Sequence, residues 1–157
     1  MRKQFLEKLT ELAERDSRII FIVGDVGFSF IEQFKDRFPN QFLNAGISEQ
    51  NMMGLAAGMT IEGWKPYCYT MKNFILLRPH EQLRNDIGFA NANVKLFGVA
   101  GSAAYRFLGM SHNLFKGEEE DILRHIPNMN SYFETEETIK DTMEKEYNRL
   151  GPAYFAI

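Results

Sequence analysis

The apolar positions of the chain follow two kinds of pattern, a helical spacing and short continuous runs. Apolar residues recur every three or four positions over residues 3–15, which predicts an amphipathic helix. Residues 19–23, IIFIV, form a continuous apolar run rich in β-branched side chains. Such a run is typical of a strand that is buried on both faces of a sheet. We therefore expect an amphipathic helix followed by a central strand.

The same two patterns alternate along the rest of the chain. Further strands are predicted over residues 41–44, 65–71, 93–99 and 129–133 and over the segment AYFAI. Helices are predicted up to about residue 37, over 49–61, over roughly 73–88, near 118–125 and after Thr135, with a loop over 100–117. Ser48 and Thr135 are the predicted N-caps. Strands alternating with helices predict an α/β domain of three layers, with a mostly parallel sheet and helices on both faces.

Composition narrows the class of protein. The 157 residues fit a single domain, and 18 basic against 21 acidic residues give a net charge of −3. This balance argues against a general nucleic-acid binder, which carries a basic excess. One cysteine fits a reducing compartment, and no apolar run approaches the ~20 residues of a membrane span. We therefore expect a cytoplasmic protein without nucleic-acid or membrane partners, while its 14 Phe and 8 Met favour a buried subunit interface.

Four turns at the carboxyl ends of predicted strands are the least generic stretches of the sequence. They cover residues 24–27, 44–49, 70–74 and 100–113. Ligands of parallel α/β sheets bind at this edge. The second turn leads into NAGISEQNMMGLAAG (residues 44–58), which places Glu49 in the first turn of a helix rich in Gly and Ala. The helix dipole favours an acidic residue there, so Glu49 taken alone has an ordinary structural explanation.

Taken together, six segments resemble one family. The string at residues 44–58 resembles the "GI-A/S-EQNM-x-G-x-AAG" segment of the transketolase family's pyrimidine-binding domain. Matching segments, in order along the chain, are VGDVG (23–27), YTMKNFILLRPHEQLR (69–84), LGMSHN (108–113), DILR with IPNM (121–129) and GPAY (151–154). The resemblance covers essentially all of residues 3–157. It implies the fold of that domain, a three-layer sheet between helices, as a single domain over residues 1–157.

The resemblance also implies a cofactor, thiamine diphosphate, and assigns residues to it. Glu49 matches the carboxyl group that hydrogen-bonds the aminopyrimidine and makes its amino group basic enough to activate the thiazolium carbon. Phe74 matches the aromatic residue that packs on the pyrimidine ring, and Met71 stands where a second aromatic residue is common. Asp25 matches a position near the cofactor or the subunit contact, and Arg78 matches a position that helps to order the site, so both are assigned to cofactor binding. His112 matches the family's active-site histidine, which gives catalytic roles to Glu49 and His112.

The resemblance further implies a partner chain. In this family a second domain holds Mg²⁺ and the diphosphate, and its GDG motif is absent here because Val26 stands in the third position. We therefore expect no metal site in this chain, and a separate subunit that carries the diphosphate- and Mg²⁺-binding domain. Pairing of two pyrimidine domains, helped by the small residues of 49–61, would give an α₂β₂ assembly.

Three functions stay open at this point. Leu108 stands where sugar-phosphate transketolases carry an acidic residue, and the loop is closer to split, transketolase-like enzymes. We expect a catalytic subunit that transfers a two-carbon ketol unit between sugar-type substrates. The VGDVG turn, which is similar to that of the pyruvate dehydrogenase β subunit, favours a 2-oxo-acid decarboxylase or a deoxyxylulose-phosphate-synthase-like enzyme instead. The third alternative is a non-catalytic interaction subunit.

Overall fold

The chain alternates helices and strands as the sequence predicts. The computed structural model describes residues 1–100 and 103–157, so part of the predicted loop over 100–117 lies outside the described residues. The strands are β1 (Ile19–Val23), β2 (Phe42–Asn44), β3 (Lys65–Met71), β4 (Lys95–Val99), β5 (Asn130–Phe133) and β6 (Ala153–Ala156). The helices are α1 (Arg2–Arg15), α2 (Glu32–Arg37), α3 (Glu49–Ile61), α4 (Lys72–Leu77), α5 (His80–Gln82), α6 (Glu118–Leu123) and α7 (Ile139–Tyr147). Short 3₁₀ helices cover Pro39–Gln41 and Ala103–Ser111, and a π-helix covers Leu83–Phe89.

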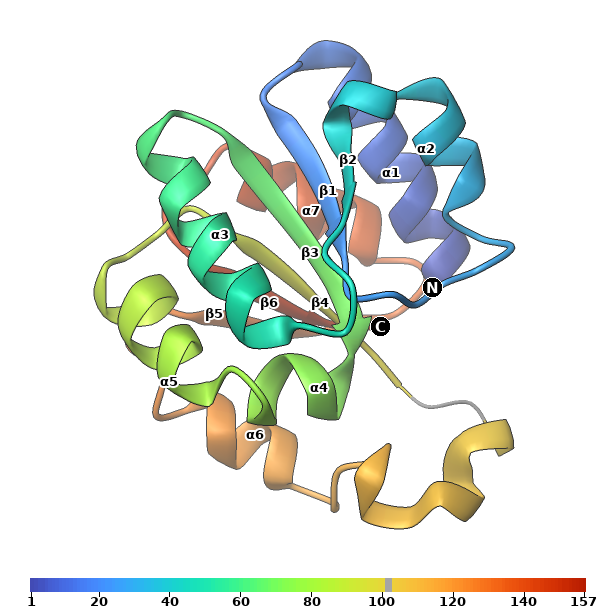
Figure 1. The fold of residues 1–157 in the computed structure, drawn as a ribbon, viewed down its shortest axis with the longest axis vertical. Helices are drawn as coiled ribbons and strands as arrows, with labels where there is room; N and C mark the ends of the chain where they lie inside the picture. Colours follow the sequence, from blue (N-terminus) through green and yellow to red (C-terminus); the bar gives the residue numbers. More distant parts are fainter. Residues whose placement is uncertain (101–102) are drawn as a thin grey trace.

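Six parallel strands form one sheet in the order β2-β1-β3-β4-β6-β5 (Figure 1). All five strand pairs are parallel, and Tyr69 at the middle of the sheet lies opposite Val23 on one side and Phe97 on the other. Parallel neighbours require crossover connections, and helices supply them at most of the steps between strands. The predicted fold class, a parallel sheet between helices, is therefore confirmed.

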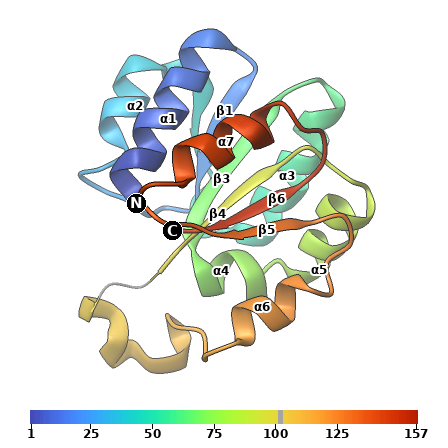
Figure 2. The ribbon, with the colours of Figure 1, turned by 180° about the vertical axis from the view of Figure 1, so that it is seen from behind.

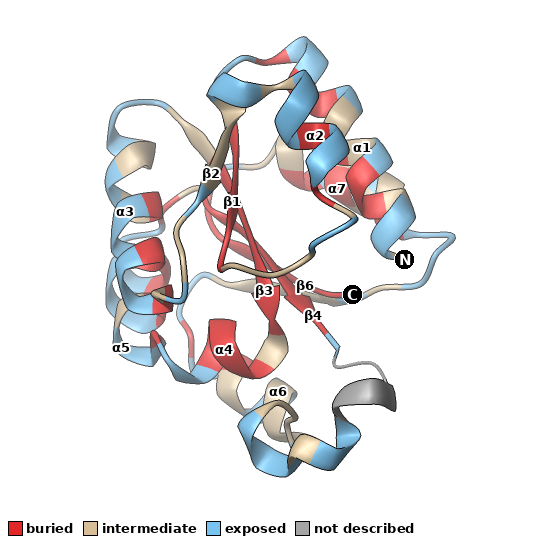
Figure 3. Ribbon diagram, turned by 45° about the vertical axis from the view of Figure 1, so that its right-hand side comes forward, coloured by how far each residue is buried: buried red, intermediate tan, exposed pale blue. Residues whose placement is uncertain are grey.

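Helices cover both faces of the sheet and divide the core in two. Helices α1, α2 and α7 cover one face (Figure 2). Their buried side chains pack there against alternate strand residues such as Phe21, Tyr69 and Phe97. Side chains of α3, α4, the π-helix and α6 pack on the other face, against Ile22 and Leu96 among others. The inner strands β1, β3, β4 and β6 are almost entirely buried, the edge strands β2 and β5 are less so, and the outer sides of the helices are exposed (Figure 3). This accounts for the continuous apolar strands in the sequence.

The connections after β1 and β3 leave the sheet in opposite directions. The segment after β1 leads to α2, whose Phe34 packs on one face, and the segment after β3 leads to α4, whose Ile75 packs on the other. Because β1 and β3 are neighbours, their carboxyl ends form a topological switch point. Ligands of parallel α/β sheets bind at such points.

The long helix predicted over residues 73–88 is broken, and this prediction was wrong. The chain forms α4, then α5, then the π-helix Leu83–Phe89. Pro79 stands between α4 and α5 with φ −99° and ψ 31°, and a proline cannot donate the hydrogen bond that a continuous helix needs. The carbonyl of Pro79 instead accepts a bond from the amide of Leu83, at 2.7 Å. The break turns the chain immediately after Arg78.

Of the two predicted N-caps, Ser48 is confirmed in position and Thr135 is wrong. Ser48 is the N-cap residue of α3, but its hydroxyl donates to the carbonyl of Ala45 at 2.6 Å and accepts no hydrogen bond from the helix. Thr135 lies ahead of the last helix, which begins at Ile139 with Thr138 as its N-cap residue. The hydroxyl of Thr138 accepts the backbone N–H of Thr135 at 3.1 Å, forming a local turn before the helix. In both places a short polar side chain stabilises the preceding turn.

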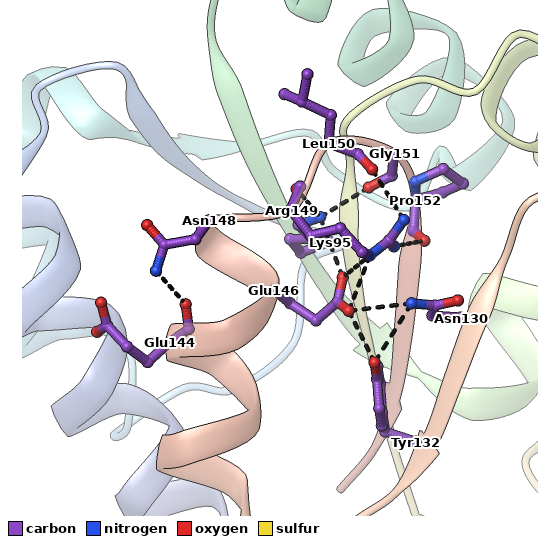
Figure 4. A network of polar contacts seen from close by, with 10 residues as sticks. All are labelled: Lys95, Asn130, Tyr132, Glu144, Glu146, Asn148, Arg149, Leu150, Gly151 and Pro152. Carbon is purple, nitrogen blue, oxygen red and sulfur yellow. Dashed lines mark hydrogen bonds and ion pairs between the residues drawn. The ribbon is translucent and has the colours of Figure 1, made fainter.

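A buried polar network, here called the Glu146 network, lies at the amino end of β4 (Figure 4). Its members are Lys95, Asn130, Tyr132, Glu146, Arg149 and the carbonyl of Gly151. The ammonium of Lys95 donates to the carbonyls of Gly151 at 2.7 Å and Arg149 at 3.2 Å, and lies 3.4 Å from Oε2 of Glu146. The carboxylate of Glu146 also accepts from the hydroxyl of Tyr132 at 2.7 Å. The network joins β4 to the last helix at the edge opposite the switch point.

Candidate functional site

Glu49 lies at the switch point and is almost completely buried. It is the first residue of α3, and 2% of its surface is exposed. Gly24, which follows β1, lies beside it: a Cβ on Gly24 would be 3.4 Å from Oε1 of Glu49 and 3.1 Å from the hydroxyl of Thr70. The bare backbone at Gly24 therefore leaves space next to the carboxyl group. Turns after β1, β2 and β3 meet at this point, as the sequence predicts.

Arg78 contacts two of the predicted site residues at once. Its Nη1 lies 2.9 Å from both carboxylate oxygens of Glu49. Its guanidinium carbon lies 3.6 Å from the centroid of the Phe74 ring, in a cation–π arrangement. Glu49 and Phe74 thus share one partner and lie within the span of a single guanidinium group.

His112 reaches the same site from the other side of Phe74. The two ring centroids are 5.1 Å apart with an interplanar angle of 70°, so the rings meet edge to face. The hydroxyl of Ser111 lies 2.8 Å from Nδ1 of His112. The side-chain amide of Asn73 donates to the carbonyl of Ser111 at 2.6 Å and thereby ties the segment carrying His112 to helix α4. The structure brings Glu49, Phe74 and His112 together.

Met71 and Asp25 lie at the same edge of the sheet in different settings. Met71 ends β3 and is buried. Asp25 has the left-handed φ of 53°, and its carboxylate accepts the side-chain amide of Asn44 at 2.9 Å. The side-chain oxygen of Asn44 accepts the N–H of Asp25 in return, at 3.1 Å. Asp25 therefore orders the turn after β1, and its nearness to a cofactor stays a prediction.

Two buried polar atoms beside these residues have no hydrogen-bond partner within the described part of the chain. They are the hydroxyl oxygen of Thr70 and the side-chain oxygen of Asn73. Buried polar atoms are usually paired, so these two oxygens are available to a polar ligand at this edge. A buried carboxyl group, an aromatic ring and free polar atoms suit a flat heteroaromatic group such as an aminopyrimidine. Across residues 1–100 and 103–157, no cluster of three or more metal-binding side chains occurs.

Sequence reasoning missed part of this site. Thr70, Asn73 and Gly24 all lie within the matched segments, but neither spacing nor residue type singled them out. Their importance depends on contacts across the sheet edge, such as the bond from Asn73 to Ser111, 38 residues away. The ion pair of Arg78 with Glu49, 29 residues apart, is likewise a property of the folded chain.

Comparison with known protein families shows to which family the chain belongs. The sequence profile of the family described as "Transketolase, pyrimidine binding domain" matches residues 1–157. The chain belongs to this family. The resemblance inferred from the six segments is confirmed, and the buried Glu49 begins the helix of the matching segment at residues 44–58.

Individual relatives of this pyrimidine-binding domain include components of split transketolases. One subunit of the apulose-4-phosphate transketolase of Phocaeicola vulgatus is 33% identical over 161 residues, covering 97% of this chain and 51% of that protein. The 1-deoxy-D-xylulose-5-phosphate synthase of Bacillus cereus is 36% identical over 126 residues, covering 78% of this chain and 19% of that protein. A solved structure described as a split gene transketolase, inactive beta4 tetramer, aligns with a TM-score of 0.84 and 29% identity, covering 99% of this chain and 50% of that one.

These relatives are longer than the present chain. It spans about half the length of the split transketolase components that it matches. Among the helices of the described residues, none has the length and apolar character needed to cross a bilayer.

Proposed function

We propose that this chain is the pyrimidine-binding, catalytic part of a two-component thiamine-diphosphate enzyme of transketolase type. It transfers a two-carbon ketol unit between sugar-type substrates in the cytoplasm. One observation carries the proposal: a buried carboxyl group, Glu49, lies beside Phe74 at the switch point of a transketolase-family sheet. The similarity to a component of an apulose-4-phosphate transketolase supports the sugar-type reaction.

Each residue of the proposed site has a separate role. Glu49 holds a hydrogen bond to a ring nitrogen of the pyrimidine, and its burial keeps water from competing for that bond. Phe74 offers an apolar ring face, and Met71 adds an apolar wall at the end of β3. When bound, thiamine diphosphate supplies the nucleophilic carbon that attacks the substrate carbonyl. His112, at the edge of Phe74, hydrogen-bonds substrate oxygens or moves a proton.

A partner subunit completes the proposed site. It would carry the domain that binds the diphosphate and Mg²⁺, as the family resemblance implies. Large apolar side chains near the carboxyl edge of the sheet are exposed, namely Phe28, Ile47, Phe107, Met110 and Phe115. Exposed apolar groups of this size are typical of an interface. A related chain of a split transketolase is described as an inactive tetramer of β chains, which supports the need for a second component.

Self-association would form an α₂β₂ assembly. Gly54 and Gly58 lie on the exposed side of α3, where an added Cβ would meet no atom within 4 Å. Packing within this chain therefore does not require glycine at either position. A second copy approaching α3 closely would require it.

A binding titration with matched variants tests the proposal. The chain is co-expressed with a candidate diphosphate-domain subunit, and thiamine diphosphate is titrated with MgCl₂ by calorimetry. Binding by the mixture and by neither chain alone is expected. Glu49→Gln should lower turnover of a ketose phosphate by about 100-fold or more, because the proton-sharing carboxyl group is lost. Glu62→Gln, at the exposed C-terminal end of the same helix, is the control.

The outcomes separate the three hypotheses. A complex that stays stable but binds no cofactor would leave an interaction subunit. Full activity of Glu49→Gln would also contradict the catalytic assignment. Turnover of pyruvate or another 2-oxo acid, without turnover of ketose phosphates, would support the second candidate. That candidate is favoured by the 36% identity to a 1-deoxy-D-xylulose-5-phosphate synthase.

A further inference from the structure

Arg78 fills the place that the proposed function gives to the pyrimidine. The cofactor is proposed to use the carboxyl group of Glu49 and the ring face of Phe74. In the structure the guanidinium of Arg78 occupies both, 2.9 Å from the two carboxylate oxygens and 3.6 Å from the ring centroid. A planar, delocalised cation is a physical match for a flat, protonatable heteroaromatic ring. The two occupants therefore exclude each other.

The geometry of the ion pair suits a contact that can be released. One nitrogen, Nη1, approaches both oxygens of Glu49, in place of the parallel two-nitrogen fork that makes Arg–carboxylate pairs strongest. The side chain of Arg78 is 41% exposed, whereas that of Glu49 is 2% exposed. Arg78 can thus move outward into water without opening the core, and its charge stays solvated throughout. Both residues line a groove of about 470 Å³ together with Ile47, Ser48, Gln50 and Asn51.

We propose that Arg78 is a built-in occupant of the pyrimidine site, which the cofactor must displace to bind. The proposal rests on the proposed function and makes Arg78 a determinant of cofactor affinity and association rate. Only the fraction of molecules in which Arg78 has moved away is competent to bind, so the apparent affinity falls by that fraction.

The direction in which removal of Arg78 changes the affinity for thiamine diphosphate separates a competing role from a cofactor-holding role. If Arg78 held the cofactor, removing it would weaken binding. If Arg78 competes with the cofactor, Arg78→Ala and Arg78→Gln should bind thiamine diphosphate about threefold more tightly and associate faster, as loss of a partly exposed ion pair predicts. The wild-type complex should approach the variants as KCl rises, because salt screens the ion pair. Arg84→Ala, at an exposed arginine six residues further along the chain, is the control.

A second measurement needs no cofactor. Thermal unfolding of the cofactor-free chain is recorded for Arg78→Ala, Glu49→Gln and the double variant. Each single change should lower the melting temperature, and the double change should cost less than the sum of the two, because the pair is lost only once.

The results decide between the possibilities. Tighter, faster binding by the Arg78 variants, with non-additive melting temperatures, supports the inference. Weaker or unchanged binding overturns it and leaves the proposed function standing. Additive melting temperatures also overturn it, since the pair would then not exist in solution. A wild-type complex that binds no thiamine diphosphate at all overturns the proposed function and this inference with it.

Discussion

Removing the carboxylate of Glu146 should destabilise the fold strongly without touching the proposed site. The side chains of Lys95 and Glu146 are 3% and 1% exposed. Glu146→Leu leaves the Lys95 ammonium buried with only two backbone carbonyls, and it takes the acceptor away from Tyr132 and Arg149. Breaking a buried ion pair on one side costs about 3–5 kcal/mol. Arg149 is 30% exposed and can be rehydrated, so the lower end, about 3 kcal/mol, is expected.

Urea unfolding at pH 7 measures this loss, with Glu144→Leu as the matched control. Glu144 lies two residues earlier on the same helix, and its pairs with Lys8 and Arg15 are partly exposed. Exposed pairs contribute about 1 kcal/mol or less. Equal losses for the two variants would refute the argument that burial makes the Glu146 network strong. A double change of Lys95→Met with Glu146→Leu should recover much of the stability, because no ammonium group is then left buried without a carboxylate and the remaining cation, Arg149, is partly exposed.

The same network gives the stability a pH dependence. Burial lowers the pKa of Lys95 to about 8, from 10.5. The unfolded chain therefore holds this proton more tightly than the folded chain, and the free energy of unfolding rises with pH between these values. The rise from pH 8 to 10 amounts to about 2 kcal/mol. It should be missing in Lys95→Met, measured by urea unfolding at each pH.

Glu146 makes the free energy of unfolding depend on pH in the acid range as well. Burial alone would raise the pKa of Glu146, but hydrogen bonds from Tyr132, Asn130 and Arg149 outweigh it and lower the pKa. Its contribution to stability is therefore full above the ordinary glutamate pKa of about 4.3 and is lost as the pH falls through the lower folded value.

Three further predictions concern the sheet and the site. Gly98→Ala should destabilise the chain by at least about 2 kcal/mol in thermal unfolding, because its Cβ would lie 2.1 Å from the hydroxyl of Tyr154. Adding Tyr154→Leu to this variant should recover part of the lost stability. His112→Asn should lower turnover of the cofactor-loaded complex at least about tenfold with an unchanged melting temperature, since the imidazole packs at the edge of the site. An unchanged rate would show that His112 has no part in the mechanism. Asn73→Ala should speed amide hydrogen exchange around Ser111, which loses its tie to α4, and equal exchange rates would contradict that tie.

The sheet could be predicted from the sequence because its buried strands are runs of apolar residues. Runs such as IIFIV over residues 19–23 are apolar at every position, and the structure buries every residue of β1. The edge that carries the site followed from the same reasoning, since parallel strands expose their carboxyl ends on one side. Glu49, Phe74 and His112 became candidates only through the resemblance, because each has an ordinary structural explanation when taken alone.

The features that the sequence did not predict depend on local backbone restrictions, on hydrogen bonds within turns and on contacts between residues far apart in the chain. The apolar spacing of residues 73–88 favours one helix, and the backbone restriction at Pro79 overrides that spacing. Ser48 occupies the predicted N-cap position, but its hydroxyl bonds the preceding turn. The hydroxyl of Thr135 pairs with that of Thr138, which is the N-cap residue instead. The pairing of Arg78 with Glu49 requires α3 and α4 to meet over the switch point, which local sequence does not encode.

The position of β6 sets the order in which the sheet can be completed. This strand comes last along the chain, yet it lies between β4 and β5, and Phe155 stacks on Phe97 on one side and on Tyr132 on the other. Until residues 153–156 emerge from the ribosome, β4 has an open edge and β5 has no neighbour. Open strand edges recruit other chains. Nascent or truncated chains lacking β6 should therefore aggregate, and folding should be limited by the late insertion of this strand.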